Sequence, residues 1–149
     1  MGQRVVLELQ RQRYKTPTLA SAHFVVAECL TPELAEDLAG AGVAVFVDAA
    51  CDGRPAGEVT VHPVAASDVA TAAGPEGVAA GGCWEELRPE TLLGLACCLY
   101  EGAPPAFVVS VGIGSTPVGE ELSAPVEAAV AKAVLAAEEI LETWESGAK

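Results

Sequence analysis

The sequence predicts an α/β fold, a three-layer αβα sandwich around a twisted, mostly parallel sheet of about four or five strands. Short apolar runs of strand length alternate along the chain with segments of helical periodicity. Two of the runs, 43–47 and 106–111, are apolar almost throughout, which is typical of strands buried on both faces of a parallel sheet. We expect all 149 residues to form one domain, because the chain is of single-domain length.

The first half is predicted to hold two helices and three strands. Residues 2–14 carry apolar side chains at helical spacing, and a β-branched run at 23–27 predicts a strand. A second helix is expected to start at Thr31-Pro32-Glu33 and to end near Gly40, since threonine, proline and an acid suit the first turn. The run at 43–47 is the next strand, and 58–62 alternates as a half-exposed strand does.

The second half begins with an Ala- and Gly-rich stretch, 65–82, which we interpret as a long loop. A helix is predicted from Pro89 to Leu99, a buried strand at 106–111, and a long last helix from about Pro125. One feature is unusual: the chain starts with a helix, whereas doubly wound domains usually start with a central strand.

Composition excludes several classes of function. The net charge of −13 argues against a nucleic-acid partner. No apolar run is long enough to span a membrane, and no secretory signal is evident, so we expect a cytoplasmic protein. The odd cysteine number and the lack of a CxxC pair favour reduced thiols, most of them buried as small apolar side chains. The cysteines are Cys29, Cys51, Cys83, Cys97 and Cys98.

Asp48 is the strongest candidate for chemistry, because it is an acid directly after an apolar strand, where α/β sheets bind ligands. It suits a metal ligand or general base, or alternatively a cap for the following loop. His23 and His62 are interpreted as exposed or hydrogen-bonded residues at strand ends rather than ligands. Cys51 is a candidate thiol nucleophile in the loop beyond Asp48, and the adjacent pair Cys97-Cys98 is expected in the core. Gly112-Ile113-Gly114 lacks the remaining glycine of a dinucleotide-binding motif.

Several segments taken together resemble the hydrogenase maturation protease family. They are Leu30-Thr-Pro-Glu-Leu-Ala-Glu-Asp-Leu, Val45-Phe-Val-Asp-Ala-Ala, Gly53-Arg-Pro-Ala-Gly-Glu-Val, Leu87-Arg-Pro-Glu-Thr-Leu-Leu, Tyr100-Glu-Gly-Ala-Pro-Pro, Val109-Ser-Val-Gly and Gly119-Glu-Glu-Leu-Ser. The resemblance extends from Gly2 to about Trp144, and the order and spacing of the segments carry it.

The resemblance implies an endopeptidase that removes a C-terminal peptide from the nickel-loaded large subunit of nickel-iron hydrogenase. The precursor of that subunit would be the partner, and nickel, which the substrate itself could supply, would be the only cofactor. Family members combine a carboxylate from a GxGNxxxxDDGxG-type loop, the aspartate of a VDA motif, and a histidine. Oxygen and imidazole ligands suit nickel. Asp48 matches the VDA aspartate, which implies a catalytic and metal-binding role.

The sequence departs from the family pattern in two places. Met1-Gly2-Gln3 aligns just after the acidic loop, so we expect the first strand and that loop to be missing. Glu85 stands near the position of the histidine, and Glu85 or Cys83 could take its place as a metal ligand. An inactive relative that only binds the large subunit is therefore the alternative to an active protease. An unrelated enzyme using the Cys51 thiol is a third hypothesis, and the sequence predicts no oligomeric state.

Overall fold

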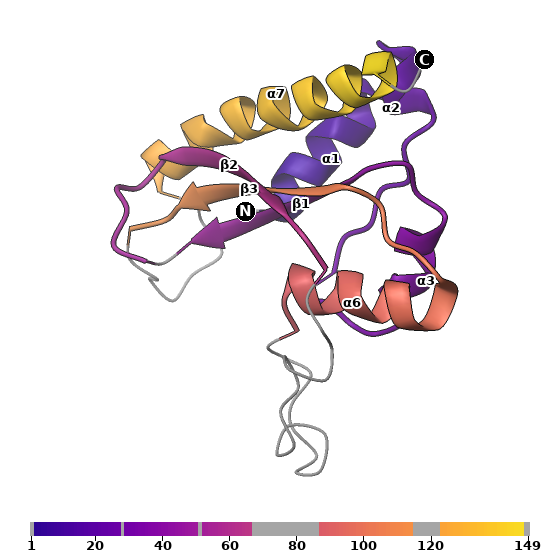
Figure 1. Ribbon diagram of the computed structural model, residues 1–149. Helices are drawn as coiled ribbons and strands as arrows, with labels where there is room; N and C mark the ends of the chain where they lie inside the picture. The colour runs from indigo at the N-terminus through magenta and orange to yellow at the C-terminus, as the bar shows by residue number, and fades with distance from the viewer. Residues whose placement is uncertain (1, 28, 51, 67–86, 115–122, 148–149) are drawn as a thin grey trace. The chain divides into compact units, whose positions relative to one another are not determined.

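The structure is a computed structural model that describes residues 2–27, 29–50, 52–66, 87–114 and 123–147. The elements follow one another along the chain as helices α1, α2 and α3, strands β1 and β2, helix α6, strand β3 and helix α7 (Figure 1). Their bounds are α1 Gly2–Gln12, α2 Pro17–Ala20, α3 Leu34–Ala39, β1 Ala44–Ala50, β2 Val59–Val64, α6 Pro89–Tyr100, β3 Ala106–Gly112 and α7 Ala124–Gly147. The α/β class is therefore confirmed.

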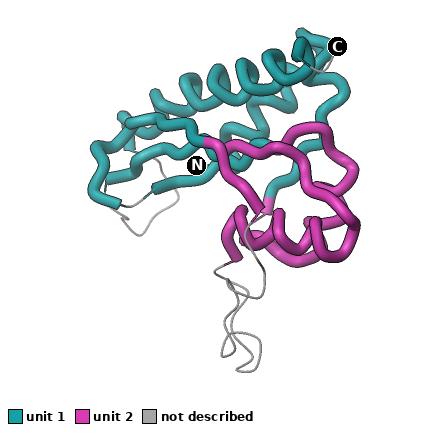
Figure 2. Tube along the Cα trace, viewed as in Figure 1, with its two compact units in different colours: residues 1–26, 45–62, 108–149 teal, residues 27–44, 63–107 magenta. Residues whose placement is uncertain are grey.

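The chain divides into two compact units and passes between them more than once (Figure 2). The first unit is made of residues 1–26, 45–62 and 108–149, and it contains α1, α2, α7 and most of the sheet. The second unit is made of residues 27–44 and 63–107, and it contains α3 and α6.

The core of the first unit lies between the sheet and the helices α1 and α7. Val5 and Leu9 on α1 are buried against Val109 and Val111 of β3. Helix α7 contributes buried residues at helical spacing, namely Val126, Ala129, Ala133, Val134 and Ala137. The first and last helices expected from apolar periodicity are thus confirmed, and each buries the face that its pattern marked as apolar.

The described sheet has three strands in the order β1-β3-β2. Strands β1 and β3 run in the same direction and β2 runs against them, so the sheet is mixed (Figure 1). Strand β3 is almost wholly buried, as predicted, and it is the middle strand of the three. Strand β1 is only half-buried, which corrects the expectation of burial on both faces. An apolar run does not reveal whether its strand will be central or at an edge.

The prediction of a strand at 23–27 is wrong, since these residues adopt no regular structure. Val25 and Val26 are exposed, while Phe24 packs against the core of the first unit. β-branched residues favour extended backbone, but a strand also needs a neighbour with which to exchange hydrogen bonds.

Helix α3 starts at Leu34 rather than directly after Thr31, whose carbonyl oxygen instead accepts a turn hydrogen bond from the Leu34 amide.

In the second unit, α3 packs against the predicted helix α6. Leu92, Leu93 and Ala96 on α6 are buried, as are Ala35 and Leu38 on α3. The expectation that the cysteines are mostly buried is contradicted by the three that are described, because Cys29, Cys97 and Cys98 are all exposed. The last turn of α6, which carries Cys97, Cys98, Leu99 and Tyr100, is exposed, whereas the buried residues of the helix lie before it.

Candidate functional site

The hydrogen bonds at both ends of the parallel pair fix its register. At one end the Ala44 amide donates to the Pro105 carbonyl over 3.0 Å, which pairs Ala44 with Ala106. At the other end the Ile113 amide donates to the Ala50 carbonyl, also over 3.0 Å, which pairs Ala50 with Gly112. Both bonds imply the same offset between β1 and β3. Asp48 is therefore the direct neighbour of Ser110 across the two strands.

A β-bulge at Gly57 sets the register on the other side of β3. The Gly57 amide donates to the Gly112 carbonyl and the Gly112 amide donates to the Glu58 carbonyl, each over 2.8 Å. Gly57 has a φ of 89°, which is the left-handed conformation that this type of bulge requires of its glycine. Counting from the bulge in antiparallel order places Thr60 opposite Ser110.

Asp48, Ser110 and Thr60 therefore form a row across the three strands, which we call the polar row. Side chains alternate between the faces of a sheet, and Val45, Val47 and Val109 point into the core formed with α1 and α7. The polar row consequently lies on the opposite face of the sheet. Asp48 is exposed, whereas Ser110 is buried, with 6% of its surface accessible.

Arg54 connects two members of the polar row. Its Nη2 donates to Ser110 Oγ over 3.1 Å, and its Nη1 donates to Thr60 Oγ1. The same guanidinium binds the carboxylate of Asp52, with Nε 2.9 Å from each oxygen and Nη2 2.8 Å from Oδ2. The buried Ser110 hydroxyl thus has a charged partner, which offsets the cost of taking it out of water.

The contact between Arg54 and Asp52 shifts the pKa values of both groups. Hydrogen bonding from Arg54 lowers the pKa of the Asp52 carboxyl below its ordinary value, because the bonds favour the ionised form. The same carboxylate raises the pKa of Arg54. Both side chains are therefore charged at neutral pH.

The loop that carries Arg54 crosses the end of β3. The order β1-β3-β2 requires this, because β1 and β2 are consecutive in sequence but are separated by β3 in the sheet. At Gly112 the loop is so close that an added Cβ would lie 2.5 Å from the Pro55 carbonyl oxygen and 3.3 Å from Arg54 Cβ. Arg54 is thus held beside the carboxyl ends of β1 and β3, the edge at which open α/β sheets bind ligands.

Asp48 was expected to follow its strand, but it lies within β1, and its Oδ1 accepts a 2.8 Å hydrogen bond from the Ala49 amide. Glu85, Cys83 and Cys51 lie outside the described residues, as does most of the loop expected at 65–82. Within the described ranges, no three His, Cys, Asp or Glu side chains come close enough together to hold a metal ion. Among the described residues, Asp48 therefore offers a metal ion a single exposed carboxylate.

His23 and His62 are exposed, as expected, but neither ends a strand, because His23 lies outside regular structure and His62 lies within β2. Arg54 and Ser110 were not singled out by the sequence reasoning. A signal was available for Arg54, since it is the only Lys or Arg between residues 16 and 87 of a strongly acidic chain. Ser110 stands in the quoted segment Val109-Ser-Val-Gly, but a serine inside an apolar strand reveals neither its neighbours nor its hydrogen-bond partner.

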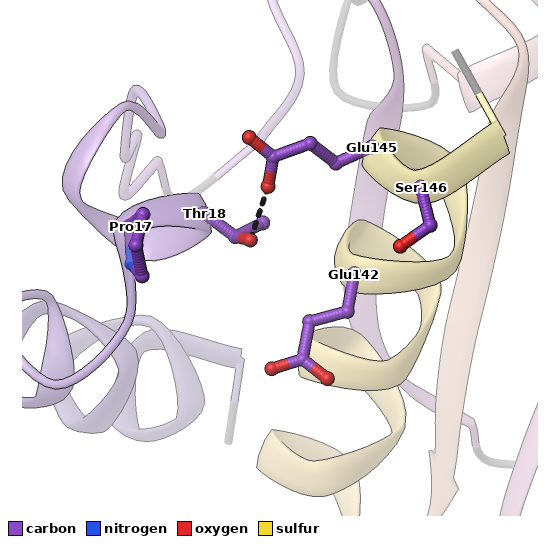
Figure 3. Close-up of a pocket in the computed structure, with 5 residues that line it drawn as sticks. All are labelled: Pro17, Thr18, Glu142, Glu145 and Ser146. Atoms are coloured by element: carbon purple, nitrogen blue, oxygen red, sulfur yellow. Dashed lines mark hydrogen bonds between the residues drawn. The ribbon is translucent and has the colours of Figure 1, made fainter. Parts of the chain in front are cut away.

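A concave region lies between α2 and the end of α7, away from the polar row (Figure 3). Glu145 on α7 accepts a hydrogen bond from the hydroxyl of Thr18, while the carboxylate of Glu142 points away from that pair. Pro17 and Ser146 complete its lining. The hydrogen bond joins α2 to α7, which is a structural role, and the polar row remains the stronger candidate site.

Comparison of the chain with known protein families, with curated proteins and with solved structures found no match. Among the described residues, no helix combines the length and the apolar character needed to cross a membrane.

Proposed function

We propose that this chain is a relative of the hydrogenase maturation proteases and acts on the C-terminal end of the large-subunit precursor of nickel-iron hydrogenase. The observation that carries the proposal is the position of Asp48. It stands in the run Val45-Phe-Val-Asp-Ala, which resembles the VDA segment of that family, and its exposed carboxylate belongs to the parallel pair β1–β3. A polypeptide at this face of the sheet can reach the carboxylate.

In this proposal the nickel ion belongs to the substrate. The described residues offer one carboxylate for it, which is too few to hold a resident ion but fits a contact to a metal that the precursor already binds. Glu85 or Cys83 would supply a further ligand from this chain. Asp48 would bind and orient the nickel centre of the precursor, so that the scissile peptide lies beside the polar row.

The proposal includes the wider architecture and location that the resemblance implies. The described strands β1, β3 and β2 would be part of a sheet of four or five strands with helices on both faces. The protein would work in the cytoplasm as a hydrolase. The partner is the large-subunit precursor, which would meet the strongly acidic surface of this chain.

The test is an incubation of the full chain with nickel-loaded precursor, followed by intact-mass measurement. We expect the precursor to lose a C-terminal peptide, and we expect nickel-free precursor to remain intact. Asp48→Asn should abolish the loss, whereas Glu139→Gln, which alters an exposed acid on α7, should not.

Binding is measured in the same samples by co-elution of the two proteins. Co-elution without cleavage would replace the protease hypothesis by that of a binding protein for the large subunit. The control is precursor that a known protease does process. If this precursor is neither cleaved by the chain nor co-elutes with it, the proposal is refuted.

A further inference from the structure

The guanidinium of Arg54 forms hydrogen bonds along two different edges. One edge, Nη1 and Nη2, donates to the hydroxyls of Thr60 and Ser110, which belong to adjacent strands. The other edge, Nε and Nη2, faces the carboxylate of Asp52. The sheet therefore holds the guanidinium by one edge, and the other edge is a preformed fork of the kind that binds carboxylates through two parallel hydrogen bonds.

The carboxylate that now occupies the fork comes from the same loop, two residues away. Asp52 is about half exposed, with 52% of its side-chain surface accessible, against 26% for Arg54. An exposed aspartate so near in sequence can leave by rotation of its own side chain. The two hydroxyls would still hold Arg54, because Ser110 is part of the central strand and buried.

We propose that the Nε–Nη2 edge of Arg54 is a binding subsite for a carboxylate of a polypeptide, and that Asp52 is its internal occupant. The inference rests on the proposed function for the nature of the ligand, a polypeptide bound beside Asp48. Asp48 and Ser110 are direct neighbours in the polar row, so the proposed subsite and the Asp48 carboxylate belong to the same face of the sheet. Arg54 is then a specificity-determining residue.

The electrostatics of the chain favour this ligand at this position. Acidic residues outnumber basic ones by 21 to 8, so the surface as a whole repels carboxylates. Arg54 is the exception between residues 16 and 87. A carboxylate that reaches this face of the sheet is therefore attracted at one point, which gives the bound chain a defined register.

The experiment measures binding of three acetylated tripeptides by calorimetry and by the Arg54 Nε–Hε NMR signal. Acetyl-Ala-Ala-Ala carries a free terminal carboxylate, acetyl-Ala-Glu-Ala amide carries only a side-chain carboxylate, and acetyl-Ala-Ala-Ala amide carries none. We expect one or both acidic peptides to bind and the neutral one not to bind. The peptide that binds more tightly shows whether the subsite prefers a terminal or a side-chain carboxylate.

Asp52→Asn keeps an oxygen that can accept the 3.3 Å hydrogen bond from the Arg54 amide but removes the competing charge. This variant should bind the preferred peptide about tenfold more tightly, since charged hydrogen bonds are stronger than neutral ones. Arg54→Lys should lose most of the binding, because an ammonium group cannot form the fork.

The matched control is Glu127→Gln, which frees Arg4 from an exposed ion pair of 3.3 Å. Arg4 is not held by buried hydroxyls, so we expect no gain in peptide binding. An Asp52→Asn protein that binds no acidic peptide, or binds it no more tightly than wild type, would overturn the inference, as would an equal gain in Glu127→Gln. The assay needs neither nickel nor cleavage, so its failure is separate from a failure of the proposed function.

Discussion

Replacing Gly112 by alanine is expected to destabilise the protein and to disturb the Arg54 site together. Gly112 ends the central strand β3 on the same face as Ser110. An added Cβ would lie 2.5 Å from the Pro55 carbonyl oxygen, whereas ordinary contacts begin at 3.4 Å. The loop that carries Arg54 must therefore move by nearly 1 Å, the difference between those two distances.

The magnitude follows from the contacts that the movement strains. Forcing an extra carbon into a packed site costs about 1–3 kcal/mol. The two 2.8 Å hydrogen bonds that join Gly112 to Gly57 and Glu58 resist the movement, and weakening one of them costs about 1 kcal/mol more. Alanine lowers the chain entropy of the unfolded state, which offsets about 0.5 kcal/mol of this destabilisation. We expect a net loss of roughly 2–3 kcal/mol in the free energy of unfolding.

The assay is thermal and urea unfolding followed by circular dichroism, with Gly40→Ala as the matched control. An added Cβ at Gly40 would meet nothing within 4 Å, and its φ of −90° suits alanine. Gly112→Ala should lower the melting temperature by about 5–10 °C, and Gly40→Ala should leave it within about 2 °C. Equal melting temperatures for the two variants would refute the close approach of the loop to β3.

Three further outcomes are expected. Leu92 on α6 is 1% exposed, so Leu92→Ala should lower the free energy of unfolding, measured in urea, by about 2–5 kcal/mol. Leu99 on the same helix is 63% exposed, so Leu99→Ala should lower it by less than about 0.5 kcal/mol. Similar losses for the two variants would contradict the assigned buried face. Because Arg54 lowers the pKa of Asp52, the stability that Asp52 contributes is complete above its unfolded pKa of about 3.9 and is lost as pH falls through its lower folded pKa. The difference in melting temperature between wild type and Asp52→Asn should therefore shrink below about pH 4, and a difference that is constant from pH 6 to pH 2.5 would exclude the ion pair. Asp48→Asn should leave the melting temperature unchanged, since Asp48 is exposed, and should weaken co-elution with the nickel-loaded precursor; undiminished co-elution would remove Asp48 from the contacts to the nickel centre.

The helices and the burial of β3 could be predicted because their signals are local. The apolar spacing of α1 and α7 and the proline at the start of α6 act within a few residues of the chain. The failed strand at 23–27 had a local signal too, but a strand forms only where a neighbour accepts its hydrogen bonds. The expectation that Cys97 and Cys98 are buried was wrong because an apolar run along a helix does not show which of its turns other segments will cover.

The candidate site was predictable only at Asp48, whose position after an apolar run marks it in the sequence. The polar row depends on the register of three strands, and that register is set by hydrogen bonds between residues more than fifty positions apart, together with the bulge at Gly57. No local pattern contains this information.

The sequence by itself determined the α/β class, the buried strand β3, the amphipathic helices and the acidic surface, because each arises from composition or from periodicity along the chain. Only the tertiary structure decided which apolar strand is central, and only it placed Asp48 beside Ser110 and Arg54 above Ser110 and Thr60. These relations arise from pairing between distant segments, which side-chain alternation on a single strand leaves open.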